Sequence, residues 1–173
     1  MEPNTSLRSH VITLRSGNIV LSPMTEADWE ILERWNSDPV VMYYAGEVGG
    51  YSPEMVRRIY RGVSQNAFCF IIEFKGEPIG ETWLQKMNLE RILVKFPDED
   101  IRRIDIMIGE KELWGQGIGT AVVGMLVDFG FSKEHVDAIF GCDIDKSNVR
   151  SFKMFKRLGF EVFSETIRTT EEG

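Results

Sequence analysis

Hydrophobic and polar residues in the second half of the chain follow a pattern that predicts a strand, a turn and a helix in succession. Residues 103–108, Arg-Ile-Asp-Ile-Met-Ile, carry isoleucines at every second position, which is typical of a half-buried strand. Residues 121–129 are mostly apolar over a length that suits a buried helix. Between them lies the segment 114–120, Trp-Gly-Gln-Gly-Ile-Gly-Thr, whose alternating glycines let a backbone approach a ligand with no Cβ in the way. Because the first N–H groups of the following helix point back into this turn, the pattern predicts a phosphate site.

The rest of the pattern predicts further strands and helices. Strands are expected over residues 10–14, 18–23, 67–74, 78–87, 136–142 and 160–163. Helices are expected over residues 25–35, after Ser52-Pro53, and over 147–158, with Gly159 as a C-cap and a loop over 88–100. We therefore expect one α+β domain with a mixed sheet, spanning residues 1–173, in which residues 1–9 are flexible.

Composition and charge narrow the class of protein. Over 173 residues, 43% are hydrophobic, which is enough for one globular domain with a core. Lys and Arg number 20 against 27 Asp and Glu, giving a net charge of −7, which disfavours nucleic acid as the main partner. The negative charge suits a cationic substrate, or it simply favours solubility. No apolar run approaches the ~20 residues of a membrane span, and the polar first ten residues lack the layout of a signal peptide, so a cytoplasmic location without a membrane partner is expected.

The residues that commonly bind metals are few and scattered. The two cysteines, Cys69 and Cys142, lie within separate apolar, strand-like runs, and the two histidines, His10 and His135, are isolated. Reduced thiols in the core are therefore expected, with no metal site.

Two motifs, in this order, resemble those of the GNAT superfamily of N-acetyltransferases. The hallmark turn of that family, Gln/Arg-x-x-Gly-x-Gly/Ala, is matched by Trp114-x-x-Gly117-x-Gly119, with Trp at the first position, and a helical motif, Asn148-x-x-Ser151-x-x-x-Phe155, follows. The resemblance covers nearly the whole chain. It implies a GNAT fold, in which a central mixed, mostly antiparallel sheet is flanked by helices and its splayed central strands form the acetyl-CoA cleft. It also implies a further C-terminal strand, so either the chain is truncated or that strand comes from elsewhere, such as a partner subunit in a homodimer.

The same resemblance implies acetyl-CoA as co-substrate, without a metal. The pyrophosphate would lie on the amides of the glycine turn, and the pantetheine arm would pair with the strand before it. The implied cofactor-binding residues are Ile106, Met107, Ile108, Trp114, Gly115, Gln116, Gly117, Ile118, Gly119, Thr120, Asn148, Ser151 and Phe155. Many relatives carry Tyr at position 155 to protonate the leaving sulfur. Because Phe155 cannot donate a proton, we expect it to serve in packing.

A narrower similarity to aminoglycoside 6′-N-acetyltransferases, a class of antibiotic-resistance enzymes, rests on Asp105, Asp143 and the segment 78–80. It makes an aminoglycoside 6′-amine the leading acceptor, attacking acetyl-CoA directly in a ternary complex. An amine with a pKa near ~10 is protonated at neutral pH, so it needs a proton acceptor, and Asp105 is the expected base. The alternative for Asp105 is a solvated ion pair with Arg102 or Arg103. Asp143 is expected to hold a second amine, or else to favour the start of the following helix electrostatically.

Aromatic residues complete the expected acceptor site. Trp83 and Tyr44 are expected to line it, because aromatic faces suit cations and sugar rings, although core packing is the alternative for Trp83. Polyamines and the N-termini of ribosomal proteins or peptides are the other acceptors that the similarity allows. A non-catalytic acyl-CoA-binding module is the alternative from another class of protein, and Phe155 with the short C-terminus favours it.

Overall fold

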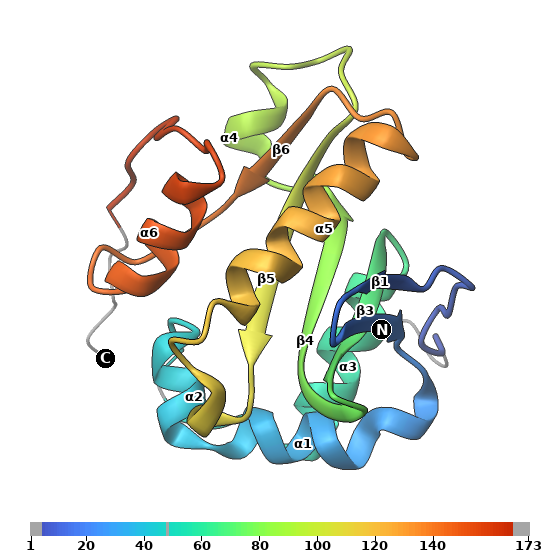
Figure 1. Cartoon of the computed structure of the whole chain (residues 1–173). Helices are drawn as coiled ribbons and strands as arrows, with labels where there is room; N and C mark the ends of the chain where they lie inside the picture. Colours follow the sequence, from blue (N-terminus) through green and yellow to red (C-terminus); the bar gives the residue numbers. More distant parts are fainter. Residues whose placement is uncertain (1–4, 48, 168–173) are drawn as a thin grey trace, which may run out of the picture.

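The structure, a computed structural model, describes residues 5–47 and 49–167, whose strands form one six-stranded sheet in the order β1-β2-β3-β4-β5-β6 (Figure 1). The strands are β1 (Leu14–Ser16), β2 (Ile19–Pro23), β3 (Ala67–Phe74), β4 (Glu77–Lys86), β5 (Ile101–Ile108) and β6 (Ala138–Gly141). Neighbouring strands are antiparallel except β5 and β6, which are parallel. The expected mixed, mostly antiparallel sheet is confirmed.

Strands β5 and β6 pair along only half of β5. Their ladder begins with Ile101 opposite Ala138 and ends with Ile104 opposite Gly141. On its other side, β5 stays paired with β4 as far as Ile108, which lies opposite Gly80. The described part of the sheet therefore splits after Ile104, as the resemblance implied for the central strands.

Local sequence explains where the helices begin. They are η1 (Glu26–Asp28), α1 (Trp29–Ser37), α2 (Pro39–Tyr44), α3 (Pro53–Ser64), α4 (Glu90–Leu93), η2 (Lys111–Leu113), α5 (Ile118–Ser132) and α6 (Val149–Arg157). Thr25 and Asp28 form a capping box at the start of η1. The Thr25 side chain accepts a hydrogen bond from the N–H of Ala27, and the Asp28 carboxylate accepts one from the N–H of Thr25. Ser52 caps α3 by accepting a hydrogen bond from the N–H of Met55 at 3.2 Å.

Two hydrophobic layers cover the two faces of the sheet. Helix α5 packs on one face, where Leu126 lies in a core cluster with Leu84 and Ile104 of the strands. Helices α1 and α3 cover the other face, where Trp35 and Tyr60 are buried. Helix α1 approaches the end of β5 so closely that a Cβ on Gly109 would lie 2.2 Å from the Trp35 ring. A glycine is therefore required at position 109 for this packing.

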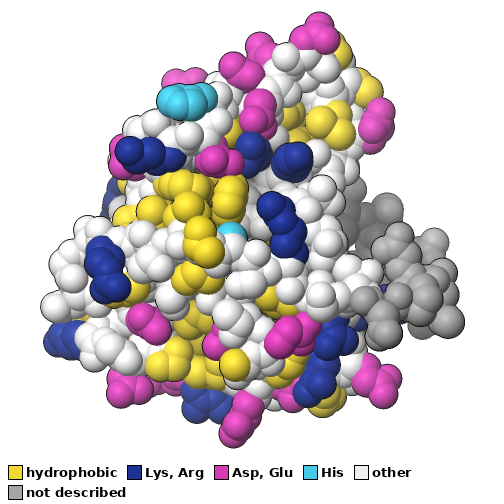
Figure 2. All heavy atoms as spheres, turned by 90° about the vertical axis from the view of Figure 1, so that its right-hand side faces the viewer, with side chains coloured by type: hydrophobic (Ala, Val, Ile, Leu, Met, Phe, Trp, Pro, Cys, Tyr) yellow, Lys and Arg dark blue, Asp and Glu magenta, His cyan; other side chains and the backbone are white. Residues whose placement is uncertain are grey.

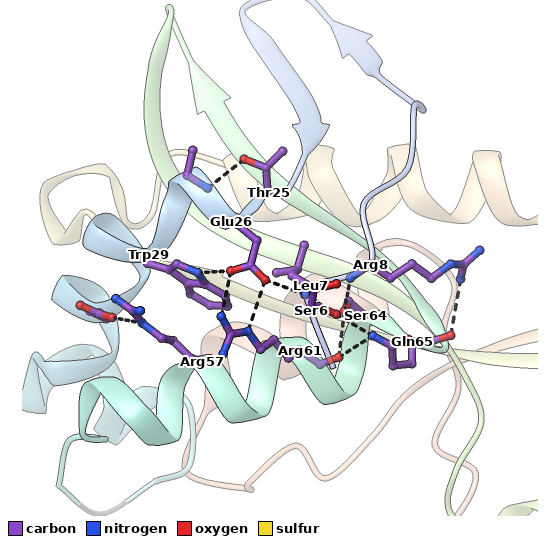
Figure 3. Close-up of polar contacts among 12 residues, drawn as sticks. Ser6, Leu7, Arg8, Thr25, Glu26, Trp29, Arg57, Arg61, Ser64 and Gln65 are labelled. Carbon is purple, nitrogen blue, oxygen red and sulfur yellow. Dashed lines mark hydrogen bonds and ion pairs between the residues drawn. The ribbon is translucent and has the colours of Figure 1, made fainter. Parts of the chain in front are cut away.

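The segment before β1 is bound to η1 and α3 (Figure 3). The backbone N–H of Leu7, a buried residue, donates to Glu26 Oε1 at 2.8 Å, and the N–H of Arg8 donates to Ser64 Oγ at 2.9 Å. The side chain of Gln65 donates to the carbonyl of Ser6 at 2.9 Å. The expected flexibility of residues 1–9 stays a prediction, and residues 1–4 lie outside the described residues.

Three expectations about the strands and loops need correction. The strand expected over 160–163 is wrong, because the described residues after α6 form no strand. Their aromatic side chains pack instead, Phe160 against Phe155 with ring centres 5.0 Å apart and Phe163 against Phe140 at 5.3 Å. The first strand begins at Leu14 rather than at residue 10, and the loop expected over 88–100 contains α4.

The surface and the cysteine and acidic residues show what the fold does with the charged and metal-binding side chains. Figure 2 shows acidic and basic side chains interspersed over the face that carries β1 and β3. No helix within the described residues is long and apolar enough to cross a membrane. Cys69 and Cys142 are both free thiols. The described residues also contain no group of three or more His, Cys, Asp or Glu side chains that could hold a metal ion.

Candidate active site

A cleft of about 180 Å³ lies between the end of β5, the glycine turn and α6. Its walls come from four parts of the chain, which are α2, the final residues of β5, the segment from η2 to the start of α5, and α6. The expected cofactor residues that line the cleft are Ile106, Met107, Ile108, Trp114, Gly115, Gly117, Ile118, Gly119, Thr120, Asn148 and Ser151. The structure therefore brings two motifs that are about 30 residues apart in the sequence to one cavity.

The conformation of the glycine turn explains its sequence. Gly115 and Gly117 both have φ near +80°, a conformation that residues with a Cβ rarely adopt, and Gly117 is the N-cap of α5. Trp114, at the position where the family has Gln or Arg, donates from its indole Nε1 to the carbonyl of Ile108 at 2.8 Å. This bond ties the turn to the end of β5, so the unpaired N–H groups of the first turn of α5 lie at the cleft wall.

A second set of contacts joins α2 to α6 at the cleft. Asn148 caps α6 through its Oδ1, which accepts from the N–H of Ser151 at 3.2 Å, and its Nδ2 donates to the carbonyl of Tyr44 at 2.9 Å. The Tyr44 ring lies edge-on to Trp114, with centres 5.2 Å apart. The guanidinium of Arg150 lies over both rings, 5.2 Å from the centre of Trp114 and 5.9 Å from that of Tyr44. Tyr44, expected in the acceptor site, thus lines the cleft beside the expected cofactor residues.

Two of the expected cofactor residues, Gln116 and Phe155, lie outside the lining of the cleft. Gln116 is exposed, and its side chain donates to the carbonyl of Glu112 at 3.2 Å. Phe155 is buried against Gly141, where a Cβ would lie 2.8 Å from the ring, and its neighbour Met154 lines the cleft instead. This location agrees with the packing role expected for Phe155.

The two expected acceptor-site aspartates lie just beyond the point where β5 and β6 separate. Asp105 follows Ile104, the last residue of β5 that pairs with β6, and Arg103 binds its carboxylate with two hydrogen bonds, at 3.0 and 3.2 Å. The pairing with Arg103 that was the alternative for Asp105 is therefore present, but the pair is partly buried rather than solvated, with side chains 13% and 28% exposed. Asp143 accepts a hydrogen bond from Arg91 of α4 at 2.7 Å.

Cys142 directly follows β6 and precedes Asp143 in the chain. Burial raises the pKa of Cys142 to about 11, and Asp105 and Asp143 add to this rise while Arg103 opposes it. Asp105 follows Ile104 by one position and Asp143 follows Gly141 by two, and Ile104 and Gly141 are the last pair of the β5–β6 ladder, so two acids that are 38 positions apart in the sequence lie at the same end of this ladder. Each is paired with an arginine: Asp105 with Arg103, which the sequence had offered as its partner, and Asp143 with Arg91, which sequence reasoning missed.

Glu81 is a further acid that sequence reasoning missed. It lies in β4 opposite Met107, is only 4% exposed, and its Oε2 has no hydrogen-bond partner among the residues that the structure describes. Burial, and then the nearby charge of Asp105, raise the pKa of Glu81 well above its usual range, although a hydrogen bond with Tyr60 opposes the shift. The signal in the sequence was a lone charge in the middle of an otherwise uncharged strand, residues 78–85.

Trp83 lies opposite Asp105 on the neighbouring strand, in register with it. Its ring packs edge-on against Tyr60, with centres 5.8 Å apart, and its Nε1 donates to Gln85 at 3.2 Å. Trp83 thus contributes to the hydrophobic layer between the sheet and α3, which is the packing alternative, while remaining beside Asp105 in the ladder.

Comparison with known proteins identifies the class of protein to which this fold and cleft belong. The acetyltransferase (GNAT) domain family matches residues 18–161, so the chain belongs to the GNAT family and is an N-acetyltransferase. The aminoglycoside N(6′)-acetyltransferase type 1 of Klebsiella pneumoniae is 26% identical over 157 residues, covering 87% of this chain and 78% of that protein.

Solved structures share the same fold and include coenzyme A complexes. An aminoglycoside acetyltransferase in complex with coenzyme A has a TM-score of 0.67 at 24% identity, covering 83% of this chain and 84% of that one. Spermidine N-acetyltransferase from Vibrio cholerae, in complex with coenzyme A and spermine, has a TM-score of 0.67 at 16% identity, covering 82% of this chain and 80% of that one. At these identities, the two neighbours establish the GNAT fold of the chain.

Proposed function

We propose that this N-acetyltransferase transfers the acetyl group of acetyl-CoA to a primary amine of a small cationic acceptor, and that an aminoglycoside 6′-amine is the leading acceptor. The observation that carries the proposal is the location of Asp105 and Asp143 just beyond the last β5–β6 pair, where Asp105 directly precedes Ile106 of the cleft lining. The similarity to an aminoglycoside 6′-acetyltransferase over 87% of the chain supports the choice of acceptor.

The acyl donor would occupy the cleft, with its pyrophosphate at the glycine turn and its pantetheine arm along residues 106–108 of β5. An oxyanion formed from the thioester carbonyl would be stabilised by a backbone N–H near Met107 or Ile108. The residues fit such a donor, because the lining combines glycines at positive φ, an open helix N-terminus and the unpaired edge of a strand.

The chemistry assigned to Asp105 is proton removal. The carboxylate takes one proton from the acceptor ammonium, and the freed lone pair attacks the thioester carbonyl. The carbon–sulfur bond then breaks as the amide forms, and the second proton lost by the nitrogen passes to water or to the departing thiolate. A carboxylate also stabilises the ammonium, so much of its benefit comes from orienting the amine. Loss of the thiolate without a general acid at Phe155 costs only about 1.4 kcal/mol near pH 7.5, because an alkyl thiol has a pKa near ~8.5. Within this proposal, an incoming ammonium competes with Arg103 for Asp105.

Thiol release from acetyl-CoA tests the proposal, with a kanamycin-type acceptor bearing a 6′-amine and its 6′-hydroxy analogue side by side. We expect release with the amine only, and a drop of about 100-fold or more in kcat/KM for Asp105→Asn. Asp128→Asn, an exposed change on α5, is the matched control and should leave kcat/KM unchanged.

The same assay separates the alternative acceptors. Release with spermidine or with an N-terminal peptide, and none with the 6′-amine, would replace the aminoglycoside proposal with a polyamine or N-terminal acetyltransferase. Binding of acetyl-CoA without turnover on any of these amines would favour an acyl-CoA-binding module with no catalytic role.

A further inference from the structure

Helix α6 presents two arginines to the cleft. Arg150 and Arg157 both line it, and Ser151 and Met154 line it between them. The two arginines are seven positions apart, which is close to two helical turns, so they lie on one side of α6. The same side of the helix therefore carries two positive charges along the length of the cleft.

These charges are not neutralised by the part of the protein that the structure describes. Arg150 and Arg157 form no ion pair with a described carboxylate, whereas six other arginines do, namely Arg34, Arg57, Arg61, Arg91, Arg102 and Arg103. Among the described residues, those that line the cleft include no Asp or Glu. In a chain of net charge −7, a cavity wall with arginines and no acids is a local reversal of sign, and it favours an anionic ligand.

Arg150 is held by aromatic rings instead of an acid. Its guanidinium lies over Trp114 and Tyr44, at 5.2 and 5.9 Å from the ring centres. Stacking uses the flat face of a guanidinium and leaves the N–H groups along its edge free to donate. The arginine is thus oriented beside the glycine turn without losing its capacity for charged hydrogen bonds.

From these contacts we infer that Arg150 and Arg157 bind phosphate groups of the acyl donor, each donating N–H groups to phosphate oxygens. The inference rests on the proposed use of acetyl-CoA, whose nucleotide end carries a pyrophosphate and a separate 3′-phosphate. Guanidinium groups bind phosphate with two parallel hydrogen bonds, which explains arginine rather than an apolar residue at these cleft positions. Residues of α6 would then contact the nucleotide end of the donor across the cleft from the glycine turn.

Calorimetric binding tests the inference without an acceptor amine. The proteins are the wild type, Arg150→Gln, Arg157→Gln and the control Arg58→Gln, an exposed arginine of α3 that forms no ion pair with a described carboxylate. The ligands are coenzyme A, adenosine 3′,5′-bisphosphate, which has phosphates without the pantetheine arm, and pantetheine, which has the arm without phosphates. We expect each cleft variant to weaken coenzyme A and the bisphosphate about 10-fold, and pantetheine less than 2-fold. The control should bind all three as the wild type does.

Each outcome bears on the inference. An unchanged affinity for coenzyme A and the bisphosphate in both variants would overturn it, and so would an equal loss for pantetheine, which would assign the arginines to cleft packing. If pantetheine binds too weakly to measure, the bisphosphate decides alone. Wild-type binding of coenzyme A with no turnover on any amine would remove the proposed function while leaving the inference in place. If the wild type binds neither coenzyme A nor the bisphosphate, both fail.

Discussion

Replacing Glu26 with Gln tests how the segment before β1 is attached to the rest of the fold. Glu26 accepts hydrogen bonds from the N–H of Leu7 at 2.8 Å, from the indole of Trp29 at 2.5 Å, and from two nitrogens of Arg61 at 3.1 and 3.3 Å (Figure 3). These donors, with Arg61 the largest contributor, lower the pKa of Glu26 from 4.5 to about 2. One carboxylate therefore links the N-terminal segment, η1 and α3.

The size of the pKa shift sets an upper limit on the effect. A shift of this size corresponds to about 3 kcal/mol for a carboxylate shielded from water. The Glu26 side chain is 41% exposed, so solvent screening reduces the contribution of its charge, and we expect Glu26→Gln to lower the free energy of unfolding by about 1–1.5 kcal/mol at pH 7. Glu33→Gln is the matched control. Among the described residues Glu33 forms one ion pair, with Arg57 at 2.9 Å, so this change should cost below about 0.5 kcal/mol.

Urea unfolding followed by tryptophan fluorescence at pH 7, 5 and 3 measures the loss of unfolding free energy in Glu26→Gln and the direction in which it changes with pH. Because the folded-state pKa of Glu26 is lowered, its stabilisation is fully present above pH 4.5 and is lost as the pH falls through about 2. The difference between wild type and Glu26→Gln should therefore be constant from pH 7 to pH 5 and smaller at pH 3. A difference that is absent at pH 7, or that is the same at pH 3 as at pH 7, would refute the argument.

Two further changes test the packing beneath the sheet and the buried acid. Gly109→Ala should lower the free energy of unfolding by about 2–3 kcal/mol in thermal unfolding, because the new Cβ would lie 2.2 Å from the Trp35 ring. Gly62→Ala is the control, because a Cβ there meets no described atom within 4 Å. Equal stability of the two variants would contradict the prediction. Glu81→Gln should become more stable relative to wild type as the pH rises from 5 to 9 in urea unfolding. The raised pKa of Glu81 means that its contribution is present below the unfolded-state pKa and is lost as the pH rises through the folded value. A pH-independent difference would show that Glu81 does not titrate in this way.

Sequence reasoning predicted the elements whose signals are local. The alternation in 103–108, the adjacent strands at 67–74 and 78–87, and the cap Ser52-Pro53 each depend on a few neighbouring residues, and the structure has β5, β3, β4 and α3 at these places. The glycine turn also combined a local conformation with its position before a helix. Such features follow from backbone preferences that a sequence displays directly.

Features set by distant packing could not be predicted in this way. The segment 160–163, Phe-Glu-Val-Phe, satisfies the pattern of a strand, but its two aromatic rings pack against Phe155 and Phe140 without backbone pairing. The sequence could not decide whether Asp105 is a base or pairs with Arg103. Residues two apart on a strand share a face whether or not their side chains form an ion pair. Arg150 and Arg157 had no signal of their own, because their place in the cleft depends on how α6 packs across α5.

The parallel ladder between β5 and β6 has a consequence for the order in which the chain assembles. A parallel pair cannot be closed by a tight turn, and the connection that joins Ile101–Ile104 to Ala138–Gly141 contains the whole of α5. Strands β3 and β4, in contrast, are joined by a two-residue turn and pair over eight positions. Closing the longer connection between β5 and β6 costs more chain entropy than closing the β3–β4 turn. The four paired positions of β5 and β6 also offset less of that cost than the eight of β3 and β4. In mild denaturant, β6 and α6 should therefore separate from the sheet before the antiparallel strands unfold, and the cleft would be lost from molecules that still retain most of their fold.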